Sequence, residues 1–307
     1  MMNEKYDVVI IGSGPAGLTA AIYAQRAKLN TLVIEKSYMS GGQIINTYEV
    51  DNYPGLQGIN GFDMGIKFRE HAEKLGAVFL QAEVLGLEVR DTYKVIKTEK
   101  GDLETICVLI ATGASHRKLA ISGELEYVGK GVSYCATCDG AFFRDKTVVV
   151  VGGGDVAVEE AIFLSRLCKR VYVVHRRDTF RAAKMLQEKL FSLDNIEVIW
   201  DSVVKEIKGG EQVQQIVIEN DRNGTIKEIL TDGVFVAIGI IPNTKEFMGV
   251  VKMNEANYII AGEDGCTNIA GIFVAGDVRT KMLRQIVTAV ADGANAIASI
   301  QEYLIEC

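Results

Sequence analysis

The sequence predicts an α/β fold with two Rossmann-like dinucleotide-binding domains, the second inserted into the first. Two observations predict this fold: an internal repeat, and a glycine-rich turn inside each copy of it. Residues 8–36 (VVIIGSGPAGLTAAIYAQRAKLNTLVIEK) and 148–176 (VVVVGGGDVAVEEAIFLSRLCKRVYVVHR) align without a gap at an offset of 140 residues. Each copy indicates a buried parallel strand, a glycine turn, an amphipathic helix and a second strand.

The glycine turns have the spacing of a dinucleotide phosphate site. They read Gly12-x-Gly14-x-x-Gly17 in the first copy and Gly152-x-Gly154-x-x-Ala157 in the second. The first glycine permits a tight turn, the second leaves room for a pyrophosphate, and the third small residue lets the helix pack on the strand. One such motif is weak evidence and could be a generic tight turn. Two, each between a strand and a helix, favour two nucleotide sites.

The ends of the second strands predict different ligands for the two sites. Glu35 ends this strand in the first copy, and His175 stands at the equivalent position in the second, followed by Arg176 and Arg177. A carboxylate accepts hydrogen bonds from ribose hydroxyls, whereas guanidinium groups bind a 2′-phosphate. We therefore expect FAD or NAD at the first site and NADPH at the second, with Arg181 within reach. The alternative is that these arginines are solvated surface charges.

Further strands and a long helix predict the domain organisation. Apolar strands ending in glycine occupy 108–113, 234–239 and 272–277, and an amphipathic helix is expected over Leu283–Leu304. Because the second repeat lies mid-chain, we expect an FAD domain of 1–114 plus 246–307 and an NADPH domain of 115–245. The connections at 114–123 and 242–249 are candidate hinges.

Composition narrows the classes of function. The net charge is −7 and no basic face is evident, which argues against nucleic-acid binding. No apolar run reaches the ~18–20 residues that span a bilayer, and the start of the chain lacks a signal-peptide pattern. We therefore expect a cytoplasmic protein without a membrane partner.

Two of the six cysteines stand apart. Cys107, Cys168 and Cys266 are scattered singly and are expected to be small buried apolar residues, and the terminal Cys307 is interpreted as incidental. Cys135 and Cys138 form a C-x-x-C motif. It could be half of a zinc site, an incidental buried pair or a redox-active dithiol. Three histidines and no second C-x-x-C argue against a metal site, so we favour the dithiol.

A dithiol and two nucleotide sites together indicate an electron-transfer route. NADPH gives a hydride, thiol–disulfide exchange uses a thiolate, and a flavin converts one into the other. Asp139, which follows the motif directly, is a candidate proton carrier; the alternative is an N-cap for a helix at 140–143.

At this point the sequence resembles the low-molecular-weight thioredoxin reductases over almost its whole length. The shared motifs are GSGPAG with Glu35, GGQ at 41–43, NYPG at 52–55, ATG at 111–113, CATCDG, GGG…EEA, HRR…R and GDV…RQ. The resemblance implies FAD contacts at Gly12, Gly14, Pro15, Ala16, Glu35, Lys36, Gly42, Gln43, Asn52, Val84, Ala111, Thr112, Gly113, Gly276, Asp277, Arg284, Gln285 and Ile286. It implies NADPH contacts at Gly153, Gly154, Asp155, Val156, Glu159, His175, Arg176, Arg177 and Arg181.

The resemblance also implies roles at the dithiol. Cys138 would lie nearest the flavin, Cys135 would attack thioredoxin or a thioredoxin-like protein, and Asp139 would transfer protons. It further implies a homodimer whose NADPH domain rotates. Phe142 and Phe143 look like aromatic residues that help dock thioredoxin, with core packing as the alternative.

Val156 departs from the family pattern, which usually has serine there. One lost hydrogen bond to the pyrophosphate would cost ~1 kcal/mol and weaken NADPH binding. This departure leaves a ferredoxin-linked reductase as an alternative, against which the retained Arg176, Arg177 and Arg181 argue. Two further alternatives, independent of Val156, are a dithiol oxidase and a nucleotide sensor without catalysis. A peroxide-linked reductase shares the motifs but carries an extra N-terminal redox domain, which we do not expect ahead of Val8.

Overall fold

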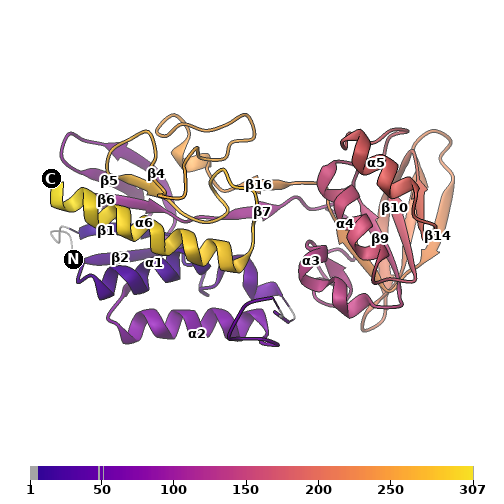
Figure 1. The fold of residues 1–307 in the computed structure, drawn as a ribbon, viewed down its shortest axis with the longest axis horizontal. Coiled ribbons are helices and arrows are strands. Elements are labelled where there is room, and N and C mark those ends of the chain that lie inside the picture. Colours follow the sequence, from indigo (N-terminus) through magenta and orange to yellow (C-terminus); the bar gives the residue numbers. More distant parts are fainter. Residues whose placement is uncertain (1–5, 48, 51, 307) are drawn as a thin grey trace. The chain divides into compact units, whose positions relative to one another are not determined.

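The computed structural model describes residues 6–47, 49–50 and 52–306. The chain forms two compact units, and each consists of separate stretches of sequence (Figure 1). The first unit comprises Met1–Ile45, Tyr53–Ser115 and Ile241–Cys307, and the second comprises Asn46–Asn52 and His116–Ile240. The connecting strands β7 (Ala114–His116) and β16 (Ile240–Pro242) pair with each other.

The first unit is built on one mixed sheet with strand order β3-β2-β1-β6-β5-β4, and β17 also pairs with β6. Its strands are β1 (Tyr6–Ile11), β2 (Thr31–Glu35), β3 (Val78–Gln81), β4 (Val84–Val89), β5 (Lys94–Thr98), β6 (Gly101–Ile110) and β17 (Ile272–Val274). β1, β2, β3, β6 and β17 are parallel, whereas β4 and β5 run antiparallel in a hairpin. Val8, Val9 and Ile10 are fully buried because layers of apolar residues cover both faces of the sheet.

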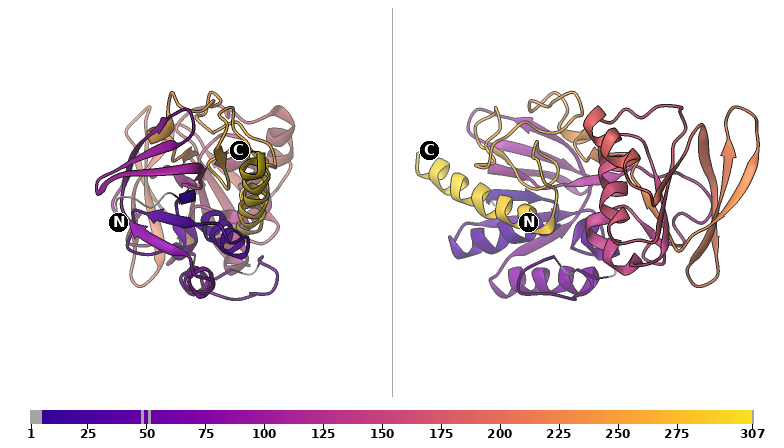
Figure 2. Two further views of the ribbon diagram at one scale, coloured as in Figure 1. Left: turned by 90° about the vertical axis from the view of Figure 1, so that its left-hand side faces the viewer. Right: turned by 45° about the vertical axis from the view of Figure 1, so that its right-hand side comes forward.

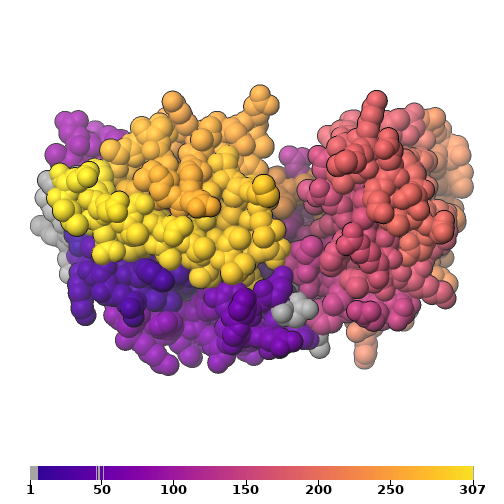
Figure 3. Space-filling model, in the orientation of Figure 1, coloured from indigo at the N-terminus to yellow at the C-terminus, as the bar shows by residue number. Residues whose placement is uncertain are grey.

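Three helices cover this unit: α1 (Pro15–Arg26), α2 (Gly61–Lys74) and α6 (Ile286–Glu306), with short 3-10 turns η1 (Gly42–Asn46) and η3 (Lys245–Phe247). α6 packs along α1, and in the space-filling view it covers much of the visible face of this unit in yellow (Figures 2 and 3). The helix begins at Ile286, three residues later than expected. The N–H of Gln285 donates to the hydroxyl of Thr288, which itself donates to the carbonyls of Leu283 and Gln285, so these groups form a turn ahead of the helix.

The second unit has a parallel sheet in the order β11-β10-β9-β15-β8 and an antiparallel sheet in the order β12-β13-β14. The strands are β8 (Val132–Ser133), β9 (Thr147–Val151), β10 (Arg170–Val174), β11 (Ile196–Ile199), β12 (Ser202–Gly209), β13 (Val213–Asn220), β14 (Ile226–Leu230) and β15 (Gly233–Val236). The helices are α3 (Ala136–Asp139), η2 (Gly140–Phe143), α4 (Asp155–Ser165) and α5 (Lys184–Phe191).

The predicted repeat is confirmed down to its register. Val8 pairs with Thr31 between β1 and β2, and the residues 140 positions later, Val148 and Val171, pair between β9 and β10. The same apolar strand, small-residue turn and helix thus generate the same βαβ unit twice. In the part of the chain that the structure describes, no helix is both long enough and apolar enough to span a membrane.

Candidate functional site

Cys135 and Cys138 form a disulfide across the short helix α3 in the second unit, with their Cα atoms 5.3 Å apart. The helix supplies this spacing: the N–H groups of Cys138 and Asp139 donate to the carbonyl of Cys135 at 3.2 and 3.1 Å. Both cysteines are half-buried. The C-x-x-C motif therefore forms a disulfide on an accessible helical turn, as a redox pair requires.

Asp139 is fixed beside this disulfide by Ser133. The hydroxyl of Ser133 donates to Oδ2 of Asp139 at 2.6 Å, and the N–H of Cys135 donates to the same hydroxyl at 3.1 Å. Asp139 makes no side-chain capping hydrogen bond to η2, so the N-cap interpretation is wrong. Sequence reasoning missed Ser133, which precedes the motif at the end of a two-residue strand and has no distinctive pattern.

Phe143 belongs to the core. It is 8% exposed and packs edge-to-face on Phe235, with the ring centroids 5.2 Å apart. Its ring also fills the space beside Gly233, where an added Cβ would lie 2.2 Å from it. For Phe143 the core alternative is therefore correct and the docking expectation is wrong. Phe142 is half-buried against the same core.

The first glycine turn forms a cradle that side chains would fill. Gly12 has φ +104°, and a Cβ on it would lie 2.5 Å from the carbonyl oxygen of Ala111. Gly42 approaches Gly14 so closely that its Cβ would be 3.2 Å from the Gly14 Cα. Both positions thus need glycine because the turn packs closely against the backbone of neighbouring segments.

Glu35 ends β2 and is held by the residues of the turn. Its Oε2 accepts hydrogen bonds from the N–H and the hydroxyl of Ser13 at 2.9 and 2.7 Å, and its Oε1 accepts one from the N–H of Ser37 at 2.8 Å. A cavity of about 190 Å³ opens beside it, with Arg69 stacked over the ring of Phe79, 3.2 Å from the centroid. Ser13, Arg69 and Phe79 were not foreseen, because they come from three separate segments.

Two polar atoms at the C-terminal side of the same unit are buried without a hydrogen bond in the described residues: Oδ1 of Asp277 and Nε of Arg284. Burial raises the pKa of Asp277. The N–H of Gly276 donates to Oδ2 of Asp292, which also bonds Arg279, so this turn is anchored to α6. Unsatisfied buried polar atoms call for an explanation, and the polar groups of a bound ligand would satisfy them.

The structure brings the other predicted FAD residues to several places. Gln43 donates to the carbonyl of Ala114, and Thr112 donates to that of Asn243 at 2.6 Å. Asn52 is exposed and lies in the 46–52 segment, which belongs to the second unit. The remaining residues lie in the first unit, at the β1–α1 turn (Pro15, Ala16), after β2 (Lys36), at the start of β4 (Val84), after β6 (Ala111, Gly113) and at the start of α6 (Gln285, Ile286).

The second glycine turn leads into α4. A Cβ on Gly154 would meet nothing within 4 Å, so its surroundings are open at the start of this helix. Oδ1 of Asp155 accepts a hydrogen bond from the N–H of Ala183 at 2.7 Å and ties the loop after β10 to the turn. Val156 is 52% exposed, and Glu159 is exposed one turn further along α4. These residues line the open end of the βαβ unit.

The predicted basic cluster is present on the loop after β10. Arg176, Arg177 and Arg181 are exposed, and none of them forms an ion pair within the described residues. The N–H of Arg181 donates to the carbonyl of Gly153 at 2.8 Å, which ties the cluster to the glycine turn. Burial lowers the pKa of His175, as do the neighbouring arginines. Three unpaired guanidinium groups beside a glycine turn suit a phosphate.

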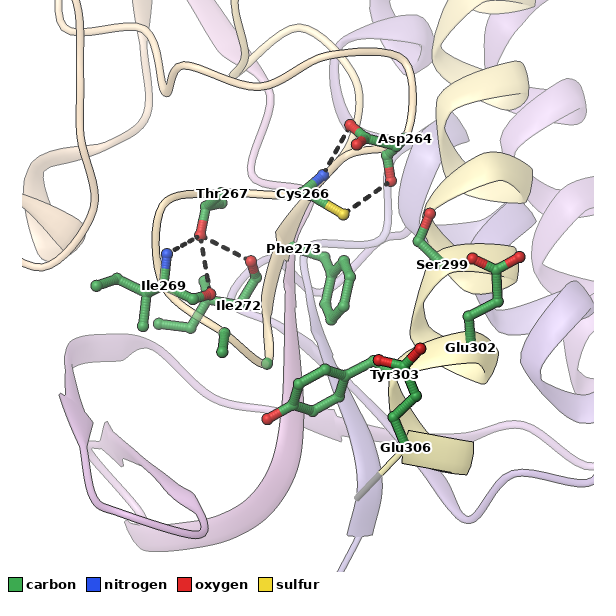
Figure 4. Close-up of a pocket in the computed structure, with 12 residues that line it drawn as sticks. Asp264, Cys266, Thr267, Ile269, Ile272, Phe273, Ser299, Glu302, Tyr303 and Glu306 are labelled. Atoms are coloured by element: carbon green, nitrogen blue, oxygen red, sulfur yellow. Dashed lines mark hydrogen bonds between the residues drawn. The ribbon is translucent and has the colours of Figure 1, made fainter.

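Two of the scattered cysteines are buried as expected, at 0% exposure for Cys107 and 5% for Cys168. Cys266 is exposed, so that expectation is wrong. The preceding Gly265 takes the buried position against Ala296 of α6, and Cys266 borders a surface cavity of about 280 Å³ with Glu302 (Figure 4). Cys307 lies outside the described residues.

Comparisons with known proteins agree with this geometry. Residues 6–293 match the pyridine nucleotide-disulphide oxidoreductase family. A thioredoxin reductase of Bacillus subtilis is 45% identical over 308 residues, which cover 100% of this chain and 97% of that protein. A thioredoxin reductase of Listeria innocua is 45% identical over 99% of this chain and 96% of its own length. The crystal structure of thioredoxin reductase from Streptococcus pyogenes has a TM-score of 0.95 at 46% identity, covering 99% of this chain and 100% of that chain.

The fold and the disulfide thus define a flavoprotein disulfide oxidoreductase, and the chain belongs to the pyridine nucleotide-disulphide oxidoreductase family. The three relatives named above are thioredoxin reductases, a class that uses FAD and NADPH, the two cofactors predicted from the two glycine turns.

Proposed function

We propose that this chain is an NADPH-dependent thioredoxin-disulfide reductase. Electrons would pass from NADPH through FAD to the disulfide of Cys135 and Cys138, and then to thioredoxin or a thioredoxin-like protein. The observation that carries the proposal is that disulfide, which lies on an accessible turn beside the Asp139 carboxyl group, in a chain with two dinucleotide turns.

The first unit provides the groups for FAD. Gly12 and Gly14 would hold the pyrophosphate at the start of α1, and Glu35 would accept hydrogen bonds from the adenosine ribose. Asp277 and Arg284 would form hydrogen bonds with other polar groups of FAD through Oδ1 and Nε, the two buried atoms without a partner in the described residues. When bound, the flavin supplies the conversion of a hydride into two electrons for a disulfide.

The second unit provides the groups for NADPH. Gly154 would hold the pyrophosphate at the start of α4, and Arg176, Arg177 and Arg181 would bind the 2′-phosphate through charge-assisted hydrogen bonds. Val156 offers no hydroxyl there, which leaves one hydrogen bond fewer and a moderately weaker site. The unpaired state of the three arginines supports a phosphate ligand over a solvated surface cluster.

The dithiol and its acid would complete the route. After reduction, the thiolate of Cys135 attacks the disulfide of the partner, a mixed disulfide forms, and Cys138 resolves it by forming the intramolecular disulfide again. Asp139, held by Ser133, would give and take the proton that this exchange requires. The proposal includes a homodimer in the cytoplasm, where thioredoxin keeps protein thiols reduced.

Anaerobic reduction of the purified protein's flavin tests the route at its first step. We expect NADPH to bleach the flavin absorbance quickly, NADH slowly, and reduced ferredoxin not at all. Adding oxidised thioredoxin to the reduced protein should then restore the flavin absorbance and yield free thiols. Bleaching by reduced ferredoxin alone would show that NADPH is not the electron donor. Oxygen uptake with a small dithiol in place of NADPH would indicate a dithiol oxidase.

Light scattering measures the molar mass in solution and so tests the proposed homodimer.

A further inference from the structure

Glu160, the second glutamate of the GGG…EEA motif, is half-buried, and the proposed route gives it no role. It lies on α4, and its Oε1 accepts a hydrogen bond from the N–H of Ala136 at 3.2 Å. Ala136 is fully buried and stands between the two cysteines in the sequence. Oε2 of Glu160 is also buried and makes no hydrogen bond within the described residues. A carboxyl group is thus in contact with the backbone of the C-x-x-C turn.

The surroundings of Glu160 disfavour its charged form. The pKa of Glu160 is raised to about 7: burial raises it most, the hydrogen bond from Ala136 partly opposes this, and the negative charge of Asp139 on α3 adds a smaller rise. Among the other described charged groups on α4 and the elements packed around it, none on α5 (Lys184, Glu188, Lys189), β10 (Arg170) or α4 itself (Asp155, Glu159) adds to the shift. Glu160 therefore changes charge near neutral pH.

We propose that Glu160 is a positioning residue of the dithiol, which acts through its charge on the acidity of Cys135 and Cys138. In its neutral form it leaves thiolate formation unopposed. In its charged form it adds a second negative charge to the side of the turn that holds Asp139, and so keeps the thiols protonated. The inference deepens the proposed function, because it requires the two cysteines to exist as a dithiol for part of the cycle.

The charge of Glu160 changes the free energy of the thiolate that forms after reduction. Opening the disulfide takes up two electrons and two protons to give two thiols, and a thiol must lose one proton to become the attacking thiolate. A nearby carboxylate raises the free energy of that thiolate, as like charges do. At low pH, where Glu160 is neutral, the penalty is absent. As the pH rises through about 7, Glu160 loses its proton and the penalty appears.

Alkylation of the dithiol tests this directly, without NADPH or thioredoxin. The FAD-bound protein is reduced with a small dithiol, freed of it anaerobically, and treated with iodoacetamide between pH 5 and 9. Modification of Cys135 and Cys138 is followed separately by peptide mass spectrometry. Glu160→Gln removes the charge but keeps an oxygen that can accept the Ala136 hydrogen bond. Glu188→Gln, at an exposed position on α5, removes one charge from the same unit and serves as the matched control.

We expect Glu160→Gln to react like the wild type at pH 5.5 and roughly tenfold faster near pH 8, as an effect of about one pKa unit on the thiol requires. Glu188→Gln should follow the wild type throughout. Equal rates for Glu160→Gln and the wild type at every pH, or a difference that does not change with pH, would overturn the proposal. If Glu160→Gln fails to fold, alkylation of Cys135 in the Cys138→Ser variant decides, because no second thiol can then add a step: a two-step profile supports the role, and a single titration step refutes it.

Failure of this test and failure of the proposed function are distinguishable. A protein whose flavin is not reduced by NADPH can still show the expected alkylation profile, since the dithiol is produced chemically. Conversely, normal thioredoxin reduction with a single-step profile would leave the function intact and remove Glu160 from the dithiol.

Discussion

The imidazole ring of His175 packs so closely against Gly153 in the second unit that no side chain fits at position 153. A Cβ on Gly153 would lie 2.2 Å from Cε1 and 2.3 Å from Nδ1 of the ring. His175 directly follows β10, the second strand of the repeat, and is buried, and its Nε2 contacts the carbonyl oxygen of Thr179 at 3.1 Å. The glycine turn and the loop that carries the arginines are therefore packed directly against each other.

We expect Gly153→Ala to displace His175 and with it the loop at 176–181. Overpacking of this kind costs about 1–3 kcal/mol, so the free energy of unfolding should fall by that amount. NADPH should bind at least tenfold more weakly. Urea unfolding without nucleotide and titration with NADPH measure the two effects. Gly154→Ala is the matched control: its Cβ meets nothing, so it should weaken NADPH binding without a comparable loss of stability.

Replacing Arg176 and Arg177 together by alanine should narrow the preference for NADPH over NADH. The loss of two charge-assisted hydrogen bonds to a 2′-phosphate should raise the Kd for NADPH by roughly 10- to 100-fold and leave that for NADH nearly unchanged. Rapid anaerobic flavin reduction at varied nucleotide concentration measures both constants. Arg166→Ala, exposed at the other end of α4, should change neither. An unchanged preference would show that the arginines do not bind the phosphate.

Cys138→Ser should separate the two half-reactions. The nucleotide sites contain neither cysteine, so NADPH should still bleach the flavin at the wild-type rate, while thioredoxin reduction should fall below about one thousandth. Steady-state turnover and flavin absorbance measure the two halves. Cys266→Ser, at an exposed thiol outside the disulfide, should be normal in both. Normal thioredoxin turnover in Cys138→Ser would refute the dithiol route.

Asp139→Asn should slow thioredoxin reduction by roughly 10- to 100-fold while FAD stays bound, because general acid–base groups contribute about this much or more. Ser133→Ala should cause a smaller loss of the same kind, since it removes the hydrogen bond that orients the carboxyl group. The pH dependence of kcat/KM and the protein-bound FAD content measure these effects. If Asp139→Asn keeps full activity, the carboxyl group has no part in proton transfer.

The pKa of Glu160 also makes stability depend on pH. It rises from 4.5 to about 7 on folding, so the native state binds the extra proton. This stabilises the protein fully below pH 4.5, and the contribution, on the order of 1–3 kcal/mol, is lost as the pH rises through about 7. The free energy of unfolding, measured with urea, should therefore differ less between pH 5 and pH 8 for Glu160→Gln than for the wild type. An identical difference would mean that Glu160 titrates normally.

Local pattern and the repeat, which depend on neighbouring residues, could be predicted from the sequence. Strand, turn and helix follow one another along the chain, so the offset of 140 residues predicted both βαβ units. The structure adds that Val8 and Val148 pair with equivalent partners, Thr31 and Val171. The acid at position 35 and the base cluster at 175–177 were predicted for the same reason, since each ends a strand that the pattern defines. The C-x-x-C spacing likewise predicted a redox-active pair that can close a disulfide, and the structure places that disulfide across one helical turn.

The tertiary structure decided every contact between residues far apart in the sequence. Glu160 reaches Ala136 across 24 positions because α4 packs on α3, and nothing in either segment encodes that pairing locally. Phe143 became a core residue because Gly233 leaves room for its ring, and Cys266 became exposed because Gly265 took the buried place beside it. Burial depends on how elements pack, and packing minimises exposed apolar surface over the whole unit, which no single stretch of sequence determines.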